Sequence, residues 1–150
     1  MIRAFEPVAE KYKKLAGEPF LPIRKTAYSA GYDFLSPGDI KLKPKSQKII
    51  WTDIKVKMPQ DEFLMVQIRS SLGIKYGVVL ANGTGIIDAD YYENIGNDGN
   101  IGITLKNTGK EEVFIPQGQG IAQGIFLKYL EAENCNTGGV RSGGFGSTNS

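Results

Sequence analysis

Histidine is absent from this chain of 150 residues, and cysteine occurs only once, as Cys135. The absence of histidine removes the commonest general base, the commonest zinc ligand and every Ser–His or Cys–His nucleophile pair. A lone cysteine excludes an intrachain disulfide and a cysteine-based metal site. Any hydrolytic chemistry in this chain must therefore depend on a carboxylate, a lysine, a tyrosine or a metal ion.

Long hydrophobic runs and a strong net charge are missing too. No run of roughly 18 or more apolar residues occurs, so the sequence predicts no membrane span. The net charge is +2, which is too small to favour nucleic acid or an anionic membrane as the main partner. Residues 1–7 lack the charged-then-apolar pattern of a signal peptide, which favours the cytoplasm.

Glycine is abundant, with 19 of 150 residues, which is about 13% against a usual 7% or so. Apolar residues alternate with polar ones between turn signals, and we expect roughly ten short strands. The pattern favours an all-β fold with at most one or two short helices, one of them between Pro7 and Gly17. The size fits one domain, with residues 1–135 as the β domain and residues 136–150 as a mobile C-terminal arm rich in Gly and Ser.

The most unusual stretch is 81–91, which combines glycines with carboxylates. No Lys or Arg lies between Lys75 and Lys106, whereas four carboxylates fall there: Asp88, Asp90, Glu93 and Asp98. Such an acidic site repels bare phosphates. If the chain binds a nucleotide here, a divalent cation and basic residues from elsewhere must offset that repulsion.

Five separated segments, in register along nearly the whole chain, resemble the motif set of the homotrimeric dUTP pyrophosphatases (dUTPases). They are Ser-Ala-Gly-Tyr-Asp at 29–33, Arg-Ser-Ser-Leu-Gly at 69–73, Asn-Gly-Thr-Gly-Ile-Ile-Asp-Ala-Asp-Tyr at 82–91, Gly-Gln-Gly-Ile-Ala-Gln at 118–123 and Arg-Ser-Gly-Gly-Phe-Gly-Ser-Thr at 141–148. The resemblance implies a distorted jelly-roll or β-clip subunit of a homotrimer with active sites at the subunit interfaces. It also implies Mg²⁺-dependent hydrolysis of dUTP to dUMP and pyrophosphate.

The third segment supplies the chemistry in this comparison. By resemblance, Asp88 orients and deprotonates the water that attacks the α-phosphorus, and a carboxylate is the natural base in a chain without histidine. The alternative is an aspartate that only satisfies turn amides. Tyr91 resembles the ring that packs under the deoxyribose and excludes a 2′-hydroxyl. Asn82, with backbone groups near Gly85 and Gly102, would read the uracil edge.

The phosphates and the metal fall to other segments. By resemblance, Ser70 and Ser71 bind phosphate with support from Arg69, and Gln123 makes a further phosphate-side contact. A surface ion pair is the alternative for the arginine. Asp33 matches the position that holds Mg²⁺ through its waters, and such an ion takes its other ligands from substrate phosphates.

The C-terminal arm would close the site, crossing to a neighbouring subunit. By resemblance, Phe145 stacks over the uracil and Arg141 reaches the γ-phosphate, while Gly146, Ser147 and Thr148 supply amide and hydroxyl donors. The alternative is a disordered solubilising tail, which does not explain one arginine and one phenylalanine in a glycine run.

Two departures from the family pattern stand out. Gln119 and Gly120 replace the usual Asp-Arg pair of the fourth segment, and residues 93–98 form an insertion that we expect to protrude as a loop. That loop is a candidate contact for the arm, the next subunit or a protein partner. Two other functions stay open from sequence: a dUTPase-like regulatory module that binds nucleotide and a protein partner, and the related dCTP deaminase activity.

Overall fold

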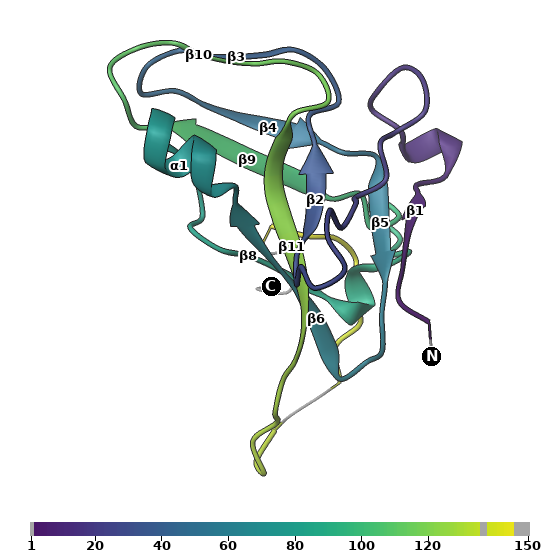
Figure 1. Cartoon of the computed structure of the whole chain (residues 1–150). Helices are drawn as coiled ribbons and strands as arrows, with labels where there is room; N and C mark the ends of the chain where they lie inside the picture. The colour runs from purple at the N-terminus through teal and green to yellow at the C-terminus, as the bar shows by residue number, and fades with distance from the viewer. Residues whose placement is uncertain (1, 136–137, 146–150) are drawn as a thin grey trace.

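The computed structural model describes residues 2–135 and 138–145. Within them the chain is built from short strands, with one α-helix and two 3₁₀ turns (Figure 1). The strands are β1 (Ala4–Pro7), β2 (Tyr32–Leu35), β3 (Ile40–Leu42), β4 (Gln47–Trp51), β5 (Ile54–Lys57), β6 (Glu62–Ile68), β7 (Val78–Leu80), β8 (Gly85–Asp88), β9 (Gly102–Asn107), β10 (Val113–Ile115) and β11 (Gly120–Lys128). The helix is α1 (Ser70–Tyr76), and the turns are η1 (Glu10–Tyr12) and η2 (Ala89–Tyr91).

The strands form four antiparallel sheets. The largest has the order β2-β11-β6-β8, the second is β4-β9-β7, and the other two are the ribbons β1-β5 and β10-β3. β11 pairs with β2 on one side and β6 on the other, so it runs through the middle of the molecule (Figure 1). The predicted all-β jelly-roll class is confirmed.

One hydrophobic core holds these sheets together. Buried and partly exposed residues alternate along β6, where Leu64 and Val66 point inward, and Ile103 and Leu105 of β9 do the same. Side chains from several sheets meet in this core, including the fully buried Leu72 of α1. Each such side chain contributes roughly 1.5–3 kcal/mol when it leaves water.

The helix predicted between Pro7 and Gly17 is wrong. Pro7 still belongs to β1, paired with β5, and only the turn η1 follows. The buried carboxylate of Asp53 accepts the backbone N–H groups of Lys14 and Leu15 at 2.9–3.0 Å. These amides therefore bond to a distant carboxylate instead of to the carbonyls of a helix. The only α-helix in the described residues is α1, in which Leu72 is the one buried residue.

The insertion at 93–98 is only partly exposed, because its polar side chains anchor it to the domain. Asn94 and Asp98 are buried, at 6% and 9% exposure. The Asp98 carboxylate accepts the Ala9 N–H at 2.7 Å and pairs with Lys55 at 3.2 Å, which ties the loop to the N-terminal segment. The loop expected to protrude is therefore tied to its own backbone and to the domain by its polar side chains, while Glu93, Ile95 and Gly96 remain exposed.

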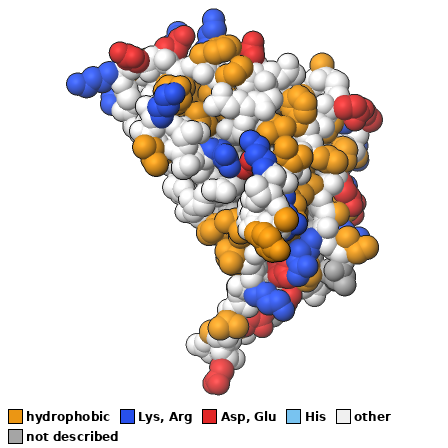
Figure 2. Space-filling view, in the orientation of Figure 1, with side chains coloured by type: hydrophobic (Ala, Val, Ile, Leu, Met, Phe, Trp, Pro, Cys, Tyr) orange, Lys and Arg blue, Asp and Glu red, His pale blue; other side chains and the backbone are white. Residues whose placement is uncertain are grey.

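The surface mixes both signs of charge. Figure 2 shows acidic, basic and hydrophobic side chains interspersed over the visible face. Among the exposed apolar residues are Tyr129 and Leu130, just beyond β11. In the described part of the chain, no helix has the length and apolar character needed to cross a membrane.

Candidate active site

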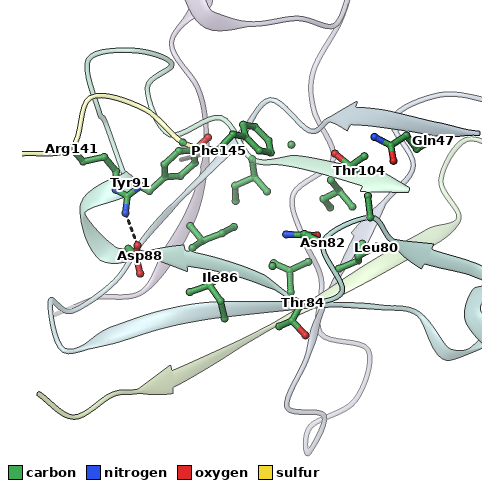
Figure 3. Close-up of a pocket in the computed structure, with 18 residues that line it drawn as sticks. Gln47, Leu80, Asn82, Thr84, Ile86, Asp88, Tyr91, Thr104, Arg141 and Phe145 are labelled. Carbon is green, nitrogen blue, oxygen red and sulfur yellow. Dashed lines mark hydrogen bonds and ion pairs between the residues drawn. The ribbon is translucent and has the colours of Figure 1, made fainter. Parts of the chain in front are cut away.

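A pocket of about 610 Å³ lies between the turn that joins β7 to β8, β9 and the C-terminal arm. We call this turn the hairpin, although β7 pairs with β9 and β8 with β6, and we call the cavity the hairpin pocket. Its volume lies within the usual range of ligand sites, which is roughly 300–1,000 Å³. Seven predicted site residues line it, from the hairpin, from β9 and from the arm: Asn82, Gly85, Asp88, Tyr91, Gly102, Arg141 and Phe145. In Figure 3, Asn82 and Phe145 project into the cavity from opposite sides, and Asp88 lies at one end below Arg141.

The hairpin backbone is held in place on both sides. β8 pairs with β6, and the Ala81 N–H donates to the Thr104 carbonyl of β9 at 2.9 Å. The Gly83 N–H closes the turn on the Leu80 carbonyl, also at 2.9 Å. Backbone donors and acceptors on this wall are therefore fixed in position, so a flat polar ligand with the wrong pattern would leave buried polar groups unpaired.

Asp88 ends β8 and precedes the turn η2. Its side chain makes no capping hydrogen bond to that turn, so the alternative of a carboxylate that only satisfies turn amides is not what the structure contains. The carboxylate is about half exposed and accepts the Arg141 guanidinium at 2.5 Å. Asp90, which the sequence reasoning gave no role, accepts the same guanidinium at 2.6 Å. The guanidinium therefore offsets the repulsion between the two carboxylates.

Tyr91 forms one wall of the hairpin pocket. The residue is buried, at 7% exposure, and its hydroxyl donates to the Asn100 carbonyl at 2.6 Å. Burial raises the pKa of this phenol above its ordinary value, so the hydroxyl stays protonated and keeps donating. The ring is thus a fixed surface against which a sugar or base could pack.

The described part of the arm, 138–145, lies over the pocket of its own chain. The Phe145 ring meets Trp51 edge-on, with centroids 6.1 Å apart. A Cβ on Gly144 would come within 2.9 Å of the Tyr91 ring, so only glycine lets the arm approach this closely. This contact argues against a tail that only solubilises the chain. Crossing to a neighbouring subunit stays a prediction, and Gly146, Ser147 and Thr148 lie outside the described residues.

Three other predicted site residues, Asp33, Arg69 and Gln123, line a second pocket of about 350 Å³. The Asp33 carboxylate is buried and pairs with Arg69 at 2.8 Å and with Lys25 at 3.5 Å. Arg69 therefore forms an ion pair, but with a buried carboxylate and not with a surface one as the alternative supposed. Sequence reasoning missed the lysine, which stands outside the five segments.

The remaining residues of the first and second sequence segments lie beside the second pocket. Ser70 and Ser71 begin α1 with exposed side chains, directly after Arg69. Gly31 leaves room for Gln123, because a Cβ there would lie 2.6 Å from the Gln123 side-chain oxygen. This gives the glycine of the first segment a packing reason and holds the glutamine beside the Asp33 ion pairs.

The two pockets lie far apart in one chain. β2, with Asp33, and β8, with Asp88, are the opposite edges of the four-stranded sheet, three strand spacings or about 14 Å apart. Along β6 they align with Gln67 and Phe63, a further displacement of four residues or about 13 Å. A single chain therefore does not bring its Asp33 group and its Asp88 group together.

A metal would need ligands from outside the chain. The described residues contain no cluster of three or more Asp, Glu, Cys or His side chains able to hold an ion. Asp33 is a lone carboxylate that already pairs with two basic side chains, Lys25 and Arg69. It fits Mg²⁺ only where waters and phosphate oxygens complete the octahedron, which is the usual way this ion binds beside nucleotides.

Comparisons with known proteins agree on one family. The sequence model of the dUTPase family matches residues 19–149. The deoxyuridine 5′-triphosphate nucleotidohydrolase of Lactococcus lactis subsp. lactis is 40% identical over 149 residues, covering 98% of this chain and 97% of the relative. The crystal structure of dUTPase from Streptococcus mutans aligns with a TM-score of 0.75 and 34% identity, over 87% of this chain and 98% of the other. A mutant dUTPase from phage phi11 of S. aureus, whose structure reveals the coordination of a structural Mg(II) ion, shares the fold at 23% identity, with a TM-score of 0.69 over 91% of this chain and 97% of the other.

Proposed function

Because the chain belongs to the dUTPase family, we propose that it hydrolyses dUTP to dUMP and pyrophosphate by attack of water on the α-phosphorus. The observation that carries this function to particular residues is the hairpin pocket, in which Asn82, Asp88 and Tyr91 converge under Phe145. A base-reading wall, a carboxylate and an aromatic ring are the parts that this reaction requires.

In this proposal Asp88 is the general base. It takes a proton from water as the water oxygen bonds to the α-phosphorus, and the bond from that phosphorus to the bridging oxygen breaks, releasing pyrophosphate. The half-exposed carboxylate is accessible to water. Arg141 must leave it for this to happen, and the γ-phosphate is the natural competitor for the guanidinium because arginine binds phosphate strongly.

Substrate choice follows from the two walls of the hairpin pocket. In this proposal the hairpin backbone and Asn82 read the donor and acceptor edge of uracil, and cytosine presents the opposite pattern. The Tyr91 ring packs under the deoxyribose, where a 2′-hydroxyl would collide with it. Phe145 then covers the base, and arm closure excludes water from the site.

The triphosphate is assigned to Arg69, Ser70, Ser71 and Gln123, and Mg²⁺ to its phosphate oxygens, with Asp33 reaching the ion through water. When bound, the ion neutralises phosphate charge and fixes the triphosphate conformation. The phage phi11 dUTPase, which shares this fold, coordinates a structural Mg(II) ion. Removing the metal with EDTA should abolish turnover, and added Mg²⁺ should restore it.

We extend the proposal to a homotrimer whose active sites are shared between subunits. Its support is the distance between the two residue groups: a triphosphate bound near Asp33 needs an Asp88 from another chain. Co-expression of Asp33→Asn subunits with Asp88→Asn subunits tests this. Mixed trimers should regain activity that neither variant has alone, because some sites then contain both intact residues. Absence of recovery in purified hybrids would contradict shared sites.

Two finer predictions remain. A protein partner at the 93–98 loop would meet Ile95, which is 80% exposed, and Ile95→Asp should abolish such binding without changing turnover. A cytoplasmic location is tested by cell fractionation.

Turnover in water enriched in heavy oxygen tests the reaction itself. The label should appear in dUMP, because the attacked atom is the α-phosphorus. Label in pyrophosphate would contradict that assignment, and ammonia release from dCTP would favour the deaminase alternative.

A further inference from the structure

The inserted loop hydrogen-bonds Tyr91 at two points, its backbone carbonyl and its side-chain hydroxyl. Asn94 donates its side-chain amide to the Tyr91 carbonyl at 2.7 Å, and the Asn97 side-chain amide donates to the Tyr91 hydroxyl at 2.8 Å. That hydroxyl in turn donates to the Asn100 carbonyl at 2.6 Å. The phenol therefore accepts one hydrogen bond and donates another, both with partners in or next to the insertion.

The orientation of the Asn97 amide is determined by its other contacts. Its oxygen accepts the Gly99 N–H at 3.0 Å and the Asn94 side-chain amide at 2.8 Å. If the oxygen and nitrogen of the Asn97 amide were exchanged, its NH₂ group would face two other donors, the Gly99 N–H and the Asn94 side-chain amide. Both of their hydrogen bonds would be lost, which costs free energy. The amide nitrogen must therefore point at the Tyr91 hydroxyl.

The ring is also confined from the side of the arm. Gly144 packs against its edge, and the Arg141 guanidinium lies 5.9 Å from its centroid. The insertion thus holds the ring from behind and the arm holds it from the pocket. Removing the Asn97 bond would leave the far end of the ring held by the Asn100 carbonyl alone.

We propose that Asn97 is a positioning residue for sugar discrimination: it holds the Tyr91 ring where a 2′-hydroxyl would collide with it. This inference rests on the proposed function, since it assigns the ring to the deoxyribose. A ring free to tilt opens space for the ribose hydroxyl, so the preference for deoxyribonucleotides falls while the chemical step at Asp88 is unaffected.

A mutant cycle between the two partners tests this, with the ratio of kcat/KM for dUTP to that for UTP as the readout. Asn97→Ala should lower the ratio about 3- to 10-fold, the usual worth of one hydrogen bond. Tyr91→Phe should lower it at least as much, because it removes the bond to the Asn100 carbonyl as well. The double variant should match Tyr91→Phe alone, because the proposed effect of the Asn97 donor on the ratio passes through the hydroxyl. Additive losses, or an unchanged ratio in Asn97→Ala, would overturn the proposal.

Two further variants separate positioning from folding. Asn97→Asp keeps the oxygen that accepts Gly99 and Asn94 but loses the donor. The single phenol proton can then serve either the new carboxylate or the Asn100 carbonyl, so one of the two bonds to the hydroxyl is lost and the ratio should fall in a folded protein. Asp98→Asn is the matched control: it loosens the same loop at Lys55 and Ala9 without contacting Tyr91. It should lower Tm and leave the ratio unchanged, and a fall in the ratio equal to that of Asn97→Ala would mean that loop stability alone is responsible.

A binding measurement keeps the proposal distinct from the proposed reaction. The affinity for dUMP relative to UMP, measured by calorimetry, does not require turnover. If the wild-type protein fails to hydrolyse dUTP but prefers dUMP and loses that preference in Asn97→Ala, the proposed reaction fails and the positioning role survives. If it hydrolyses dUTP and Asn97→Ala keeps full discrimination, the positioning role fails alone.

Discussion

Replacing Arg141 with glutamine should release the C-terminal arm from the hairpin pocket. The guanidinium pairs with Asp88 at 2.5 Å and Asp90 at 2.6 Å. The two carboxylates are 52% and 62% exposed, so solvent screens both pairs. Each such pair contributes about 0.2–1 kcal/mol, and the two together should shift the arm-docking equilibrium about 2- to 30-fold.

The fluorescence of Trp51 reports this equilibrium directly. It is the only tryptophan in the chain, and the Phe145 ring of the arm covers it edge-on. Acrylamide should therefore quench Arg141→Gln more strongly than the wild type. A chain truncated after residue 135 sets the limit for an open arm, and Arg24→Gln removes an exposed arginine elsewhere as a charge-matched control.

The salt dependence of the same quenching gives a second test. The Debye length falls from about 10 Å at 0.1 M to about 3 Å at 1 M, so wild-type quenching at high salt should approach that of Arg141→Gln, which itself should respond little. Equal quenching of wild type and variant at low salt, together with strong quenching in the truncated chain, would refute the reasoning: the arm would then be docked by its glycines and Phe145 alone.

Three other perturbations follow from the geometry. Asp88→Asn should lower kcat about 100- to 10,000-fold, the usual contribution of a general base, while calorimetry should find dUTP affinity nearly intact; equal loss of binding would make Asp88 a ligand instead. Gly96→Ala places a Cβ 2.3 Å from the arm carbonyl of Ser142, so KM for dUTP should rise, whereas Gly38→Ala, where a Cβ meets nothing within 4 Å, should behave as wild type. Hydrogen bonding from Arg3 lowers the pKa of the Glu62 carboxyl, so this pair stabilises the fold above the ordinary Glu pKa of about 4.3 and the stability is lost as the pH falls below it. Thermal melts between about pH 6 and about pH 3, which bracket that pKa, should therefore show a smaller acid-induced fall in Tm for Glu62→Gln than for the wild type. An identical fall in the two proteins would mean that the Arg3–Glu62 pair does not cause the acid sensitivity.

The sequence predicted the strands well because their alternation is a local property. Leu64 and Val66, for example, face the core at the spacing that a half-buried strand requires. The helix after Pro7 was wrong because a distant residue, Asp53, captures the amides that a helix would have used. Local periodicity carries no information about such a partner.

The site residues likewise divide into those that a local sequence segment identifies and those that only the folded chain brings together. Asp88 and Tyr91 were found because a contiguous segment with a family resemblance contains them. Asp90 stands in that segment too, and its spacing of two from Asp88 was the available signal. The role of the insertion could not be predicted, since its asparagines bond to Tyr91 and to one another only after the chain has folded. Lys25 gave no signal, because only the fold brings it to Asp33.

Pyrophosphate release from dUTP, dCTP, dTTP and UTP, each with Mg²⁺ and with EDTA, tests the central claim most directly. The account predicts rapid release from dUTP alone, and only with the metal. Such a result would require the hairpin, Tyr91 and the phosphate groups to act on one substrate. Comparable release from UTP or dCTP, or no release from dUTP with Mg²⁺ present, would contradict it.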